Sequence, residues 1–145
     1  MPRVPSVRRL ETVADLRESS DPREITVAAR HEAVLDDGRR VTLLDGRGWT
    51  SGLRGAGVDE GTDAWQFASE GEISDTARVV VGPDEAFGDR TQADMERDHW
   101  RWLAEKLAAE GVVVDADELR RLPHDVVLSE RLRARLGSTG LNGPA

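Results

Sequence analysis

The chain has 145 residues, no cysteine and a formal net charge of −8. The absence of cysteine excludes disulfide bridges, thiolate nucleophiles, iron–sulfur clusters and every zinc site that needs a thiolate. The negative net charge argues against a nucleic-acid partner, because phosphates are bound by concentrated Lys and Arg. No stretch approaches the roughly 18 apolar residues of a transmembrane helix, and the N-terminus lacks the apolar core of a signal peptide, so we expect a single cytoplasmic domain that does not bind a membrane.

Residues 1–23 are predicted to form a loosely ordered N-terminal segment with one short helix. Thr12 is the expected N-cap of this helix, and Asp15 occupies the third position after it. The remaining segments are a predicted single α+β domain, residues 24–137, and a predicted disordered tail, residues 138–145.

The clearest strand pattern covers residues 25–45, where apolar and polar side chains alternate on both sides of a turn that contains Gly38. A two-residue turn would mix apolar and polar side chains on each face, whereas a bulged turn with a left-handed Gly38 collects the apolar ones on one face. This hairpin is the expected centre of a small antiparallel sheet. The neighbours expected in the bulged register are Ala33 with Val41, His31 with Leu43, and Glu32 with Arg40 on the opposite face.

Residues 46–62 contain six glycines and are predicted to be a long flexible connection. They do not resemble a phosphate-binding loop, because no amphipathic helix follows whose N-terminus would hold the anion.

Residues 63–68 are predicted to form a further strand. Residues 70–81 follow a capping pair, Ser69 with Glu72, and their pattern leaves open whether they form a helix or a strand.

The strongest helix pattern covers residues 92–110, which we expect to pack against the sheet. Thr91 and Asp94 form a capping box at its start, and Gly111 ends it. The apolar face of this helix consists of Ala93, Trp100, Leu103, Ala104 and Leu107. The elements expected after it are a buried strand at 112–114, a helix around Leu119, a strand at 126–128 and a helix that Ser129 caps and Gly137 ends.

The excess negative charge lies in the middle of the chain. Residues 48–99 hold twelve carboxylates against four arginines, whereas the segments before and after them each balance to zero. This region is either a solvated face or a docking surface for a basic protein or a cation. Asp84 and Glu85 are its candidate binding residues, although the ligand spacing of a calcium loop is absent.

Trp102 is the candidate anchor of an interface. It lies far around the long helix from Trp100, together with Met95 and beside His99 at one edge of the apolar face. Trp and Met are enriched at protein–protein interfaces. Either another element of the chain covers this edge, or Trp102 and Met95 form an exposed binding site.

The histidines are weaker candidates for catalysis. His99 has a Glu-x-x-His spacing, but a single copy cannot build the di-iron site in which that spacing occurs. His124 precedes Asp125, and an adjacent carboxylate would raise the pKa of the imidazole and favour acid–base chemistry. The alternative is a structural His124 that bonds a backbone carbonyl. His31 is expected to be a hydrogen-bonded residue of the core.

We therefore expect a small acidic protein-binding or regulatory module, similar in size and charge to inhibitor or immunity proteins, without catalysis, metal or other cofactor. Its expected partner is a basic protein or a second copy of the chain. One alternative is a small metal-independent hydrolase or isomerase that uses His124, His99, Asp125 and Asp98. A structural homodimer is the other. Convergence of both histidines in one cavity with two or more carboxylates would favour the enzyme.

Overall fold

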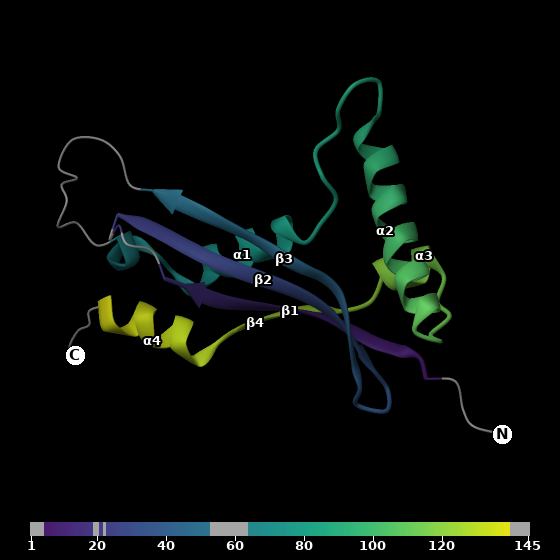
Figure 1. Cartoon of the computed structure of the whole chain (residues 1–145), viewed down its shortest axis with the longest axis horizontal. Coiled ribbons are helices and arrows are strands. Elements are labelled where there is room, and N and C mark those ends of the chain that lie inside the picture. The colour runs from purple at the N-terminus through teal and green to yellow at the C-terminus, as the bar shows by residue number, and fades with distance from the viewer. Residues whose placement is uncertain (1–4, 19–20, 22, 53–63, 140–145) are drawn as a thin grey trace.

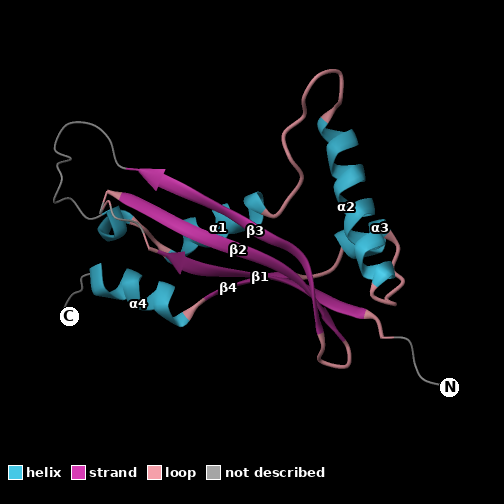
Figure 2. Cartoon of the chain, viewed as in Figure 1, coloured by secondary structure: helices cyan, strands magenta, loops and turns pink. Residues whose placement is uncertain are grey.

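The computed structural model describes residues 5–18, 21, 23–52 and 64–139 (Figure 1). Its elements are β1 (Val7–Arg17), β2 (Glu24–Leu35), β3 (Arg40–Gly52), the 3-10 helix η1 (Ala64–Phe67), α1 (Glu70–Val80), α2 (Gln92–Ala109), α3 (Ala116–Arg120), β4 (His124–Leu128) and α4 (Glu130–Thr139). The strands form one four-stranded sheet, and the α+β class is confirmed (Figure 2).

The sheet is mixed rather than purely antiparallel. Its strand order is β3-β2-β1-β4, in which β1, β2 and β3 form an antiparallel meander and β4 runs parallel to β1. A parallel strand needs a long connection, which the helical segment between β3 and β4 provides. The predicted antiparallel sheet is therefore correct for the first three strands and wrong for β4, because a local pattern does not encode the direction of a returning strand.

The helix expected near Thr12 is wrong, because this segment is β1 in the interior of the sheet. Leu10, Thr12 and Ala14 are buried on one face, and the side chains between them point to the other face, as the period of a strand requires. Pairing with β2 on one side and β4 on the other outweighs the capping pattern of Thr12 and Asp15, which is a weak local signal.

The predicted hairpin register is confirmed at the turn and changes beyond it. Ala33 pairs with Val41, and the glycine of the turn has φ +89°, as the bulged turn requires. His31, however, lies opposite Leu44 rather than Leu43, because the ladder between β2 and β3 is irregular there. Both leucines are buried, so the irregularity places two consecutive side chains of β3 in the core.

Residues 46–52 belong to β3 and do not form the flexible connection that their glycines suggested. Gly46 has φ +79°, and a Cβ on Gly48 would lie only 2.4 Å from the carbonyl oxygen of Val27 on β2. Gly46 therefore supplies a left-handed backbone conformation, and Gly48 allows a close approach of the edge strand to β2. The rest of the predicted connection, residues 53–62, lies outside the described residues.

Two helical elements follow. The strand expected at residues 63–68 is wrong, because Ala64–Phe67 form η1; so short an apolar run does not define a period. The alternative left open for residues 70–81 is resolved as α1. Ser69 caps this helix by accepting a hydrogen bond of 3.2 Å from the backbone N–H of Glu72.

α2 has the capping box that its sequence predicts. The Thr91 hydroxyl accepts a hydrogen bond of 3.1 Å from the backbone N–H of Asp94, and the Asp94 carboxylate accepts one of 3.1 Å from the backbone N–H of Thr91. Leu103 and Leu107 are fully buried, whereas Ala93 of the predicted apolar face is exposed. The first turn of α2 therefore extends beyond the core.

Replacing Thr91 by alanine is expected to lower the free energy of unfolding by about 1 kcal/mol, because a backbone N–H of the first turn loses its acceptor. Thr91→Ser keeps the hydroxyl and is the control, with an expected change below about 0.5 kcal/mol. Urea denaturation followed by circular dichroism measures both. Equal losses in the two variants would show that the hydroxyl does not cap α2.

The C-terminal third agrees with the prediction except at residues 112–114, which form no strand. Val112 is buried and Val114 packs partly buried against the same core cluster, but Val113 between them is 81% exposed, so this segment is a loop that contacts the core on one side. α3 and β4 lie where expected. α4 continues to Thr139, beyond the expected end at Gly137, and the rest of the expected tail, residues 140–145, lies outside the described residues.

The core lies on one face of the sheet, where the helices pack. One cluster of buried side chains joins Leu10 and Leu43 of the sheet to Leu103 and Leu107 of α2. A second cluster joins β1, β2 and β4 to α1, α4 and η1. The opposite face carries polar and charged side chains, so the fold has two layers and α2 is attached to the sheet near β3.

Candidate functional site

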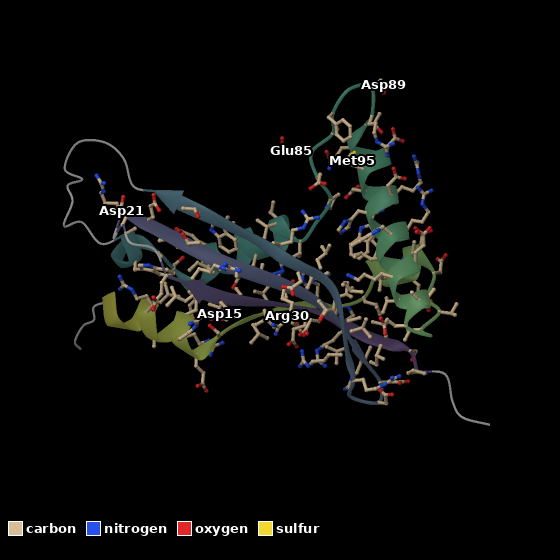
Figure 3. The ribbon with its side chains drawn as sticks, in the orientation of Figure 1. Asp15, Asp21, Arg30, Glu85, Asp89 and Met95 are labelled. Atoms are coloured by element: carbon tan, nitrogen blue, oxygen red, sulfur yellow. The ribbon has the colours of Figure 1, made fainter. Side chains whose placement is uncertain are left out.

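A surface cavity of about 430 Å³ lies between α2, the loop that precedes it and β3. It is the site toward which most of the predicted binding residues converge. The side chains that line it are Arg47, Asp84, Phe87, Arg90, Met95, Asp98, His99 and Trp102. Figure 3 shows Met95 on α2 with Glu85 and Asp89 along the neighbouring loop.

The helical repeat explains how α2 presents its part of the cavity. Met95, His99 and Trp102 are separated by four and three residues, so they lie on one flank of the helix. This flank is rotated away from Leu103 and Leu107, which hold α2 on the core. As a result, 47% of Trp102 remains exposed.

The loop over residues 82–91 forms the opposite wall. Gly82 and Pro83 follow the end of α1, and Gly88 has φ +61°, which allows the chain to reverse before α2 begins. Phe87 lies in this loop with 66% of its surface exposed. Phe87 and Trp102 line the same cavity, and exposed apolar side chains that gather in one place are typical of interaction sites.

Two ion pairs hold the polar side chains of the cavity. Arg47 of β3 pairs with Asp84 of the loop at 3.3 Å, and Arg90 donates a hydrogen bond to Asp98 of α2. Together they tie three segments of the chain to one another. The positive charges of Arg47 and Arg90 are therefore balanced by carboxylates of the same chain, so these residues do not make the cavity an anion-binding site.

The surroundings of His99 favour the neutral form of its ring. Burial, followed by the nearby positive charge of Arg47, lowers the pKa of His99, while Asp84 and Glu96 act in the opposite direction. The ring meets the Trp100 indole edge-on, with ring centroids 5.3 Å apart. His99 thus adds an aromatic, uncharged surface to the cavity.

The rim of the cavity is acidic. Residues 84–98 hold six carboxylates against two arginines. Among them Glu85 and Asp89 are exposed and form no ion pair or hydrogen bond with any described residue, and the labels of Figure 3 place both on the loop. These two carboxylates are available to cations from outside.

The predicted site residues are thus largely brought together. Trp102, Met95 and Asp84 line the same cavity, and His99 lies beside them. Glu85 lines an adjoining cavity that shares Asp84. Sequence reasoning missed Phe87, Arg47 and Arg90. Of these, Phe87 had a usable signal, since it is an aromatic residue in an acidic loop.

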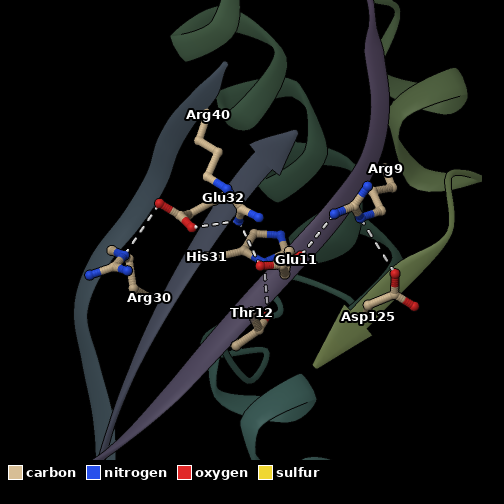
Figure 4. Close-up of polar contacts among 8 residues, drawn as sticks. All are labelled: Arg9, Glu11, Thr12, Arg30, His31, Glu32, Arg40 and Asp125. Carbon is tan, nitrogen blue, oxygen red and sulfur yellow. Dashed lines mark hydrogen bonds and ion pairs between the residues drawn. The ribbon is translucent and has the colours of Figure 1, made fainter. Parts of the chain in front are cut away.

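His124 takes part in a different arrangement, a row of hydrogen-bonded side chains on three neighbouring strands of the sheet. Thr12 Oγ1 lies 2.6 Å from His124 Nε2 and 2.9 Å from His31 Nδ1, and the two rings meet edge-on with centroids 4.9 Å apart. Figure 4 shows Thr12 beside the His31 ring. Since a hydroxyl has one proton, Thr12 can donate to one ring and accept from the other.

His124 and Asp125, the weaker candidates for an acid–base pair, point to opposite faces of the sheet. Consecutive strand residues point to opposite faces, and Asp125 forms an ion pair of 3.6 Å with Arg9 on the far face (Figure 4). Burial, and next the charge of Arg78, lower the pKa of His124, while Asp125 opposes this change. The effect of Asp125 on the pKa of His124 is thus outweighed, and His124 is not among the residues that line the cavity around His99.

The open face of the sheet carries a charge ladder. Arg40 contacts both Glu11, at 2.6 Å, and Glu32, at 3.3 Å, and the expected proximity of Arg40 to Glu32 is confirmed. Arg9 and Arg30 complete the ladder at its two ends (Figure 4). The hydrogen bond from Arg40 holds the pKa of Glu11 below its usual value. Arg40 balances the negative charges of both Glu11 and Glu32 within the ladder.

Among the described residues, no three His, Asp or Glu side chains are arranged to hold a metal ion. No helix in the same part of the chain combines the length and hydrophobicity that a membrane span requires. The chain matches no protein-family model, no curated protein and no solved structure.

Proposed function

We propose that this protein is a non-catalytic, regulatory binding module that docks a basic segment of a partner protein, and that it acts in the cytoplasm. The docking site is the cavity between α2 and the loop over residues 82–91. The observation that carries this proposal is the convergence of Phe87, Met95 and Trp102 from two segments of the chain in one cavity with an acidic rim.

The apolar side chains define the anchor of the partner. Phe87 and Trp102 expose large aromatic surfaces, and covering such surface on binding is favourable. Met95 is flexible and adapts to the shape of an apolar side chain. A large aliphatic or aromatic residue of the partner therefore fits between them.

The acidic rim defines the charge of the partner. Glu85 and Asp89 form no ion pair within the described residues, so a basic partner can pair with them without breaking an internal contact. Complementary charge accelerates association and opposes acidic competitors. Because these carboxylates are exposed, binding should weaken as salt is added.

A displayed library of random linear 12-residue peptides provides a probe for this site. We expect selection against the full chain to enrich peptides with net positive charge and one aromatic or large aliphatic residue. Trp102→Ala should weaken binding of a selected peptide at least about ten-fold, as loss of an interface anchor does. Fluorescence anisotropy measures the affinity.

Val113→Ala is the matched control, since Val113 is an exposed apolar residue that does not line the cavity. It should leave the affinity unchanged. Selected peptides that bind the Trp102→Ala protein as well as the unchanged protein would overturn the proposal. So would a dimer in sedimentation at two concentrations that Trp102→Ala abolishes, because the occupant would then be a second copy of the chain.

A further inference from the structure

A second cavity adjoins the first and extends the docking surface along the edge of the sheet. Its volume is about 350 Å³, and it lies between β3, the end of α1 and the start of the loop that follows. The residues that line it are Gly46, Arg47, Gly48, Val79, Val80, Gly82, Pro83, Asp84 and Glu85. Arg47 and Asp84 line both cavities.

The ion pair between Arg47 and Asp84 forms the boundary between the two cavities. Its atoms are 3.3 Å apart, and 71% of the Asp84 side chain is exposed. The pair therefore lies at the surface, where a ligand can pass over it. A cation from the ligand can also share Asp84, which is followed by Glu85, a carboxylate without an ion pair in the described part of the chain.

Exposed apolar side chains gather along this line. The described residues include five large hydrophobic side chains that are exposed, and three of them line one of the two cavities: Val79, Phe87 and Trp102. Val79 is 74% exposed although it lies in the last turn of α1. One apolar contact site therefore lies on each side of the ion pair.

β3 borders both cavities. It is the edge strand of the sheet, so only one of its sides is paired within the described residues. α2 reaches the other side at Leu43, whose carbonyl oxygen accepts a hydrogen bond of 3.0 Å from Lys106. Farther along, the glycines at 46 and 48 carry no side chain that would cover the strand. An extended chain can lie beside an open strand edge of this kind.

We infer that the docked segment is extended and occupies both cavities, crossing the ion pair between Arg47 and Asp84. Its large anchor lies against Phe87 and Trp102, a basic residue lies over Asp84 and Glu85, and a smaller aliphatic residue packs on Val79. This inference rests on the proposed function, and it adds the conformation of the ligand and its second apolar contact. A helical segment with one anchor would occupy the first cavity alone.

The variant Val79→Gln tests the second contact. Glutamine has a high helix propensity, so α1 should be preserved, but the apolar surface is lost. Val113→Gln is the matched control, because Val113 is exposed to a similar degree, 81% against 74%, and lies outside both cavities. The probe is the tightest-binding basic 12-residue peptide from the displayed library, measured by fluorescence anisotropy against the full chain.

We expect Val79→Gln to weaken binding of this peptide about five- to ten-fold, as loss of one buried aliphatic contact does, and Val113→Gln to have no effect. Removing the peptide residues on one side of the anchor should then abolish the difference between the two variants. If Trp102→Ala weakens binding while Val79→Gln behaves like its control, the extended conformation is wrong and the proposed docking site stands. If neither variant weakens binding, the docking site itself is wrong.

Discussion

Replacing Leu103 by alanine is expected to lower the free energy of unfolding by about 2–5 kcal/mol. Leu103 is completely buried in the cluster that joins α2 to the sheet, and truncation removes its apolar contacts and leaves a cavity. Its neighbour Trp102 is 47% exposed, so Trp102→Ala should change the same free energy by only about 1 kcal/mol. Urea denaturation monitored by circular dichroism compares the two variants.

Comparison of the Leu103→Ala and Trp102→Ala variants distinguishes a residue that stabilises the fold from one that binds a partner. We expect Leu103→Ala to weaken the fold and Trp102→Ala to weaken peptide binding while the protein stays folded. A destabilisation by Trp102→Ala as large as that by Leu103→Ala would show that Trp102 belongs to the core. In that case Trp102 would no longer qualify as the anchor of an interface.

The protein is also expected to lose stability between pH 7 and pH 5, by about 2 kcal/mol through His31 alone. Burial, with smaller effects of His124 and His99, lowers the pKa of His31 from 6.5 to about 3 in the folded state. Between these two values the unfolded chain binds a proton that the folded chain excludes. The stabilisation is therefore complete above pH 6.5 and is lost progressively as the pH falls.

Two further histidines act in the same direction as His31, and Asp15 responds only at lower pH. His124 and His99 also have lowered pKa values, so they add to the loss. The hydrogen bond from Arg131 holds the pKa of Asp15 at about 2, and the stability that this carboxylate contributes is lost only at more acid pH.

His31→Gln is the variant that isolates the effect. Its amide can still exchange a hydrogen bond with Thr12, but it does not titrate, so the difference in unfolding free energy between pH 7 and pH 5 should shrink by about 2 kcal/mol. Urea denaturation at pH 7, 6 and 5 provides the comparison. An unchanged pH dependence in His31→Gln would mean that His31 is not the group that responds.

Local patterns predict those elements whose signals lie within one segment. Thr91 and Asp94 are three residues apart and form the capping box of α2, and the spacing of Leu103 and Leu107 marks the face that this helix buries. The hairpin turn is similarly local, because Gly38 determines its geometry. Each of these features depends on residues only a few positions apart.

β1 could not be predicted in this way. Its neighbours are strands that come later in the chain, and its buried Thr12 is polar, so the apolar alternation of a half-buried strand is interrupted. Thr12 finds its hydrogen-bond partners in His31 and His124, and only the assembled sheet brings these three side chains together.

In the candidate site, too, the features that depend on neighbouring residues can be predicted, whereas those that depend on distant segments cannot. The helical repeat of α2 is sufficient to place Met95 and Trp102 on one flank, and the exposure of Trp102 follows from the rotation of this flank away from the buried face. Arg47 comes from β3, 37 residues before its partner Asp84. The place of Arg47 in the cavity depends on the extension of β3 through residues 46–52. The glycines of this segment led to the prediction of a flexible connection instead.

The pairing of β4 with β1 has a consequence for the order of folding. Thr12 and His124 lie 112 residues apart in the chain but in neighbouring strands, and contacts of such long sequence separation form slowly. While the chain is being synthesised, the meander of β1, β2 and β3 emerges first, with one side of β1 open to pairing with other chains. Completion of the sheet thus waits for the C-terminal segment, and a truncation before residue 124 would leave β1 as an aggregation-prone edge.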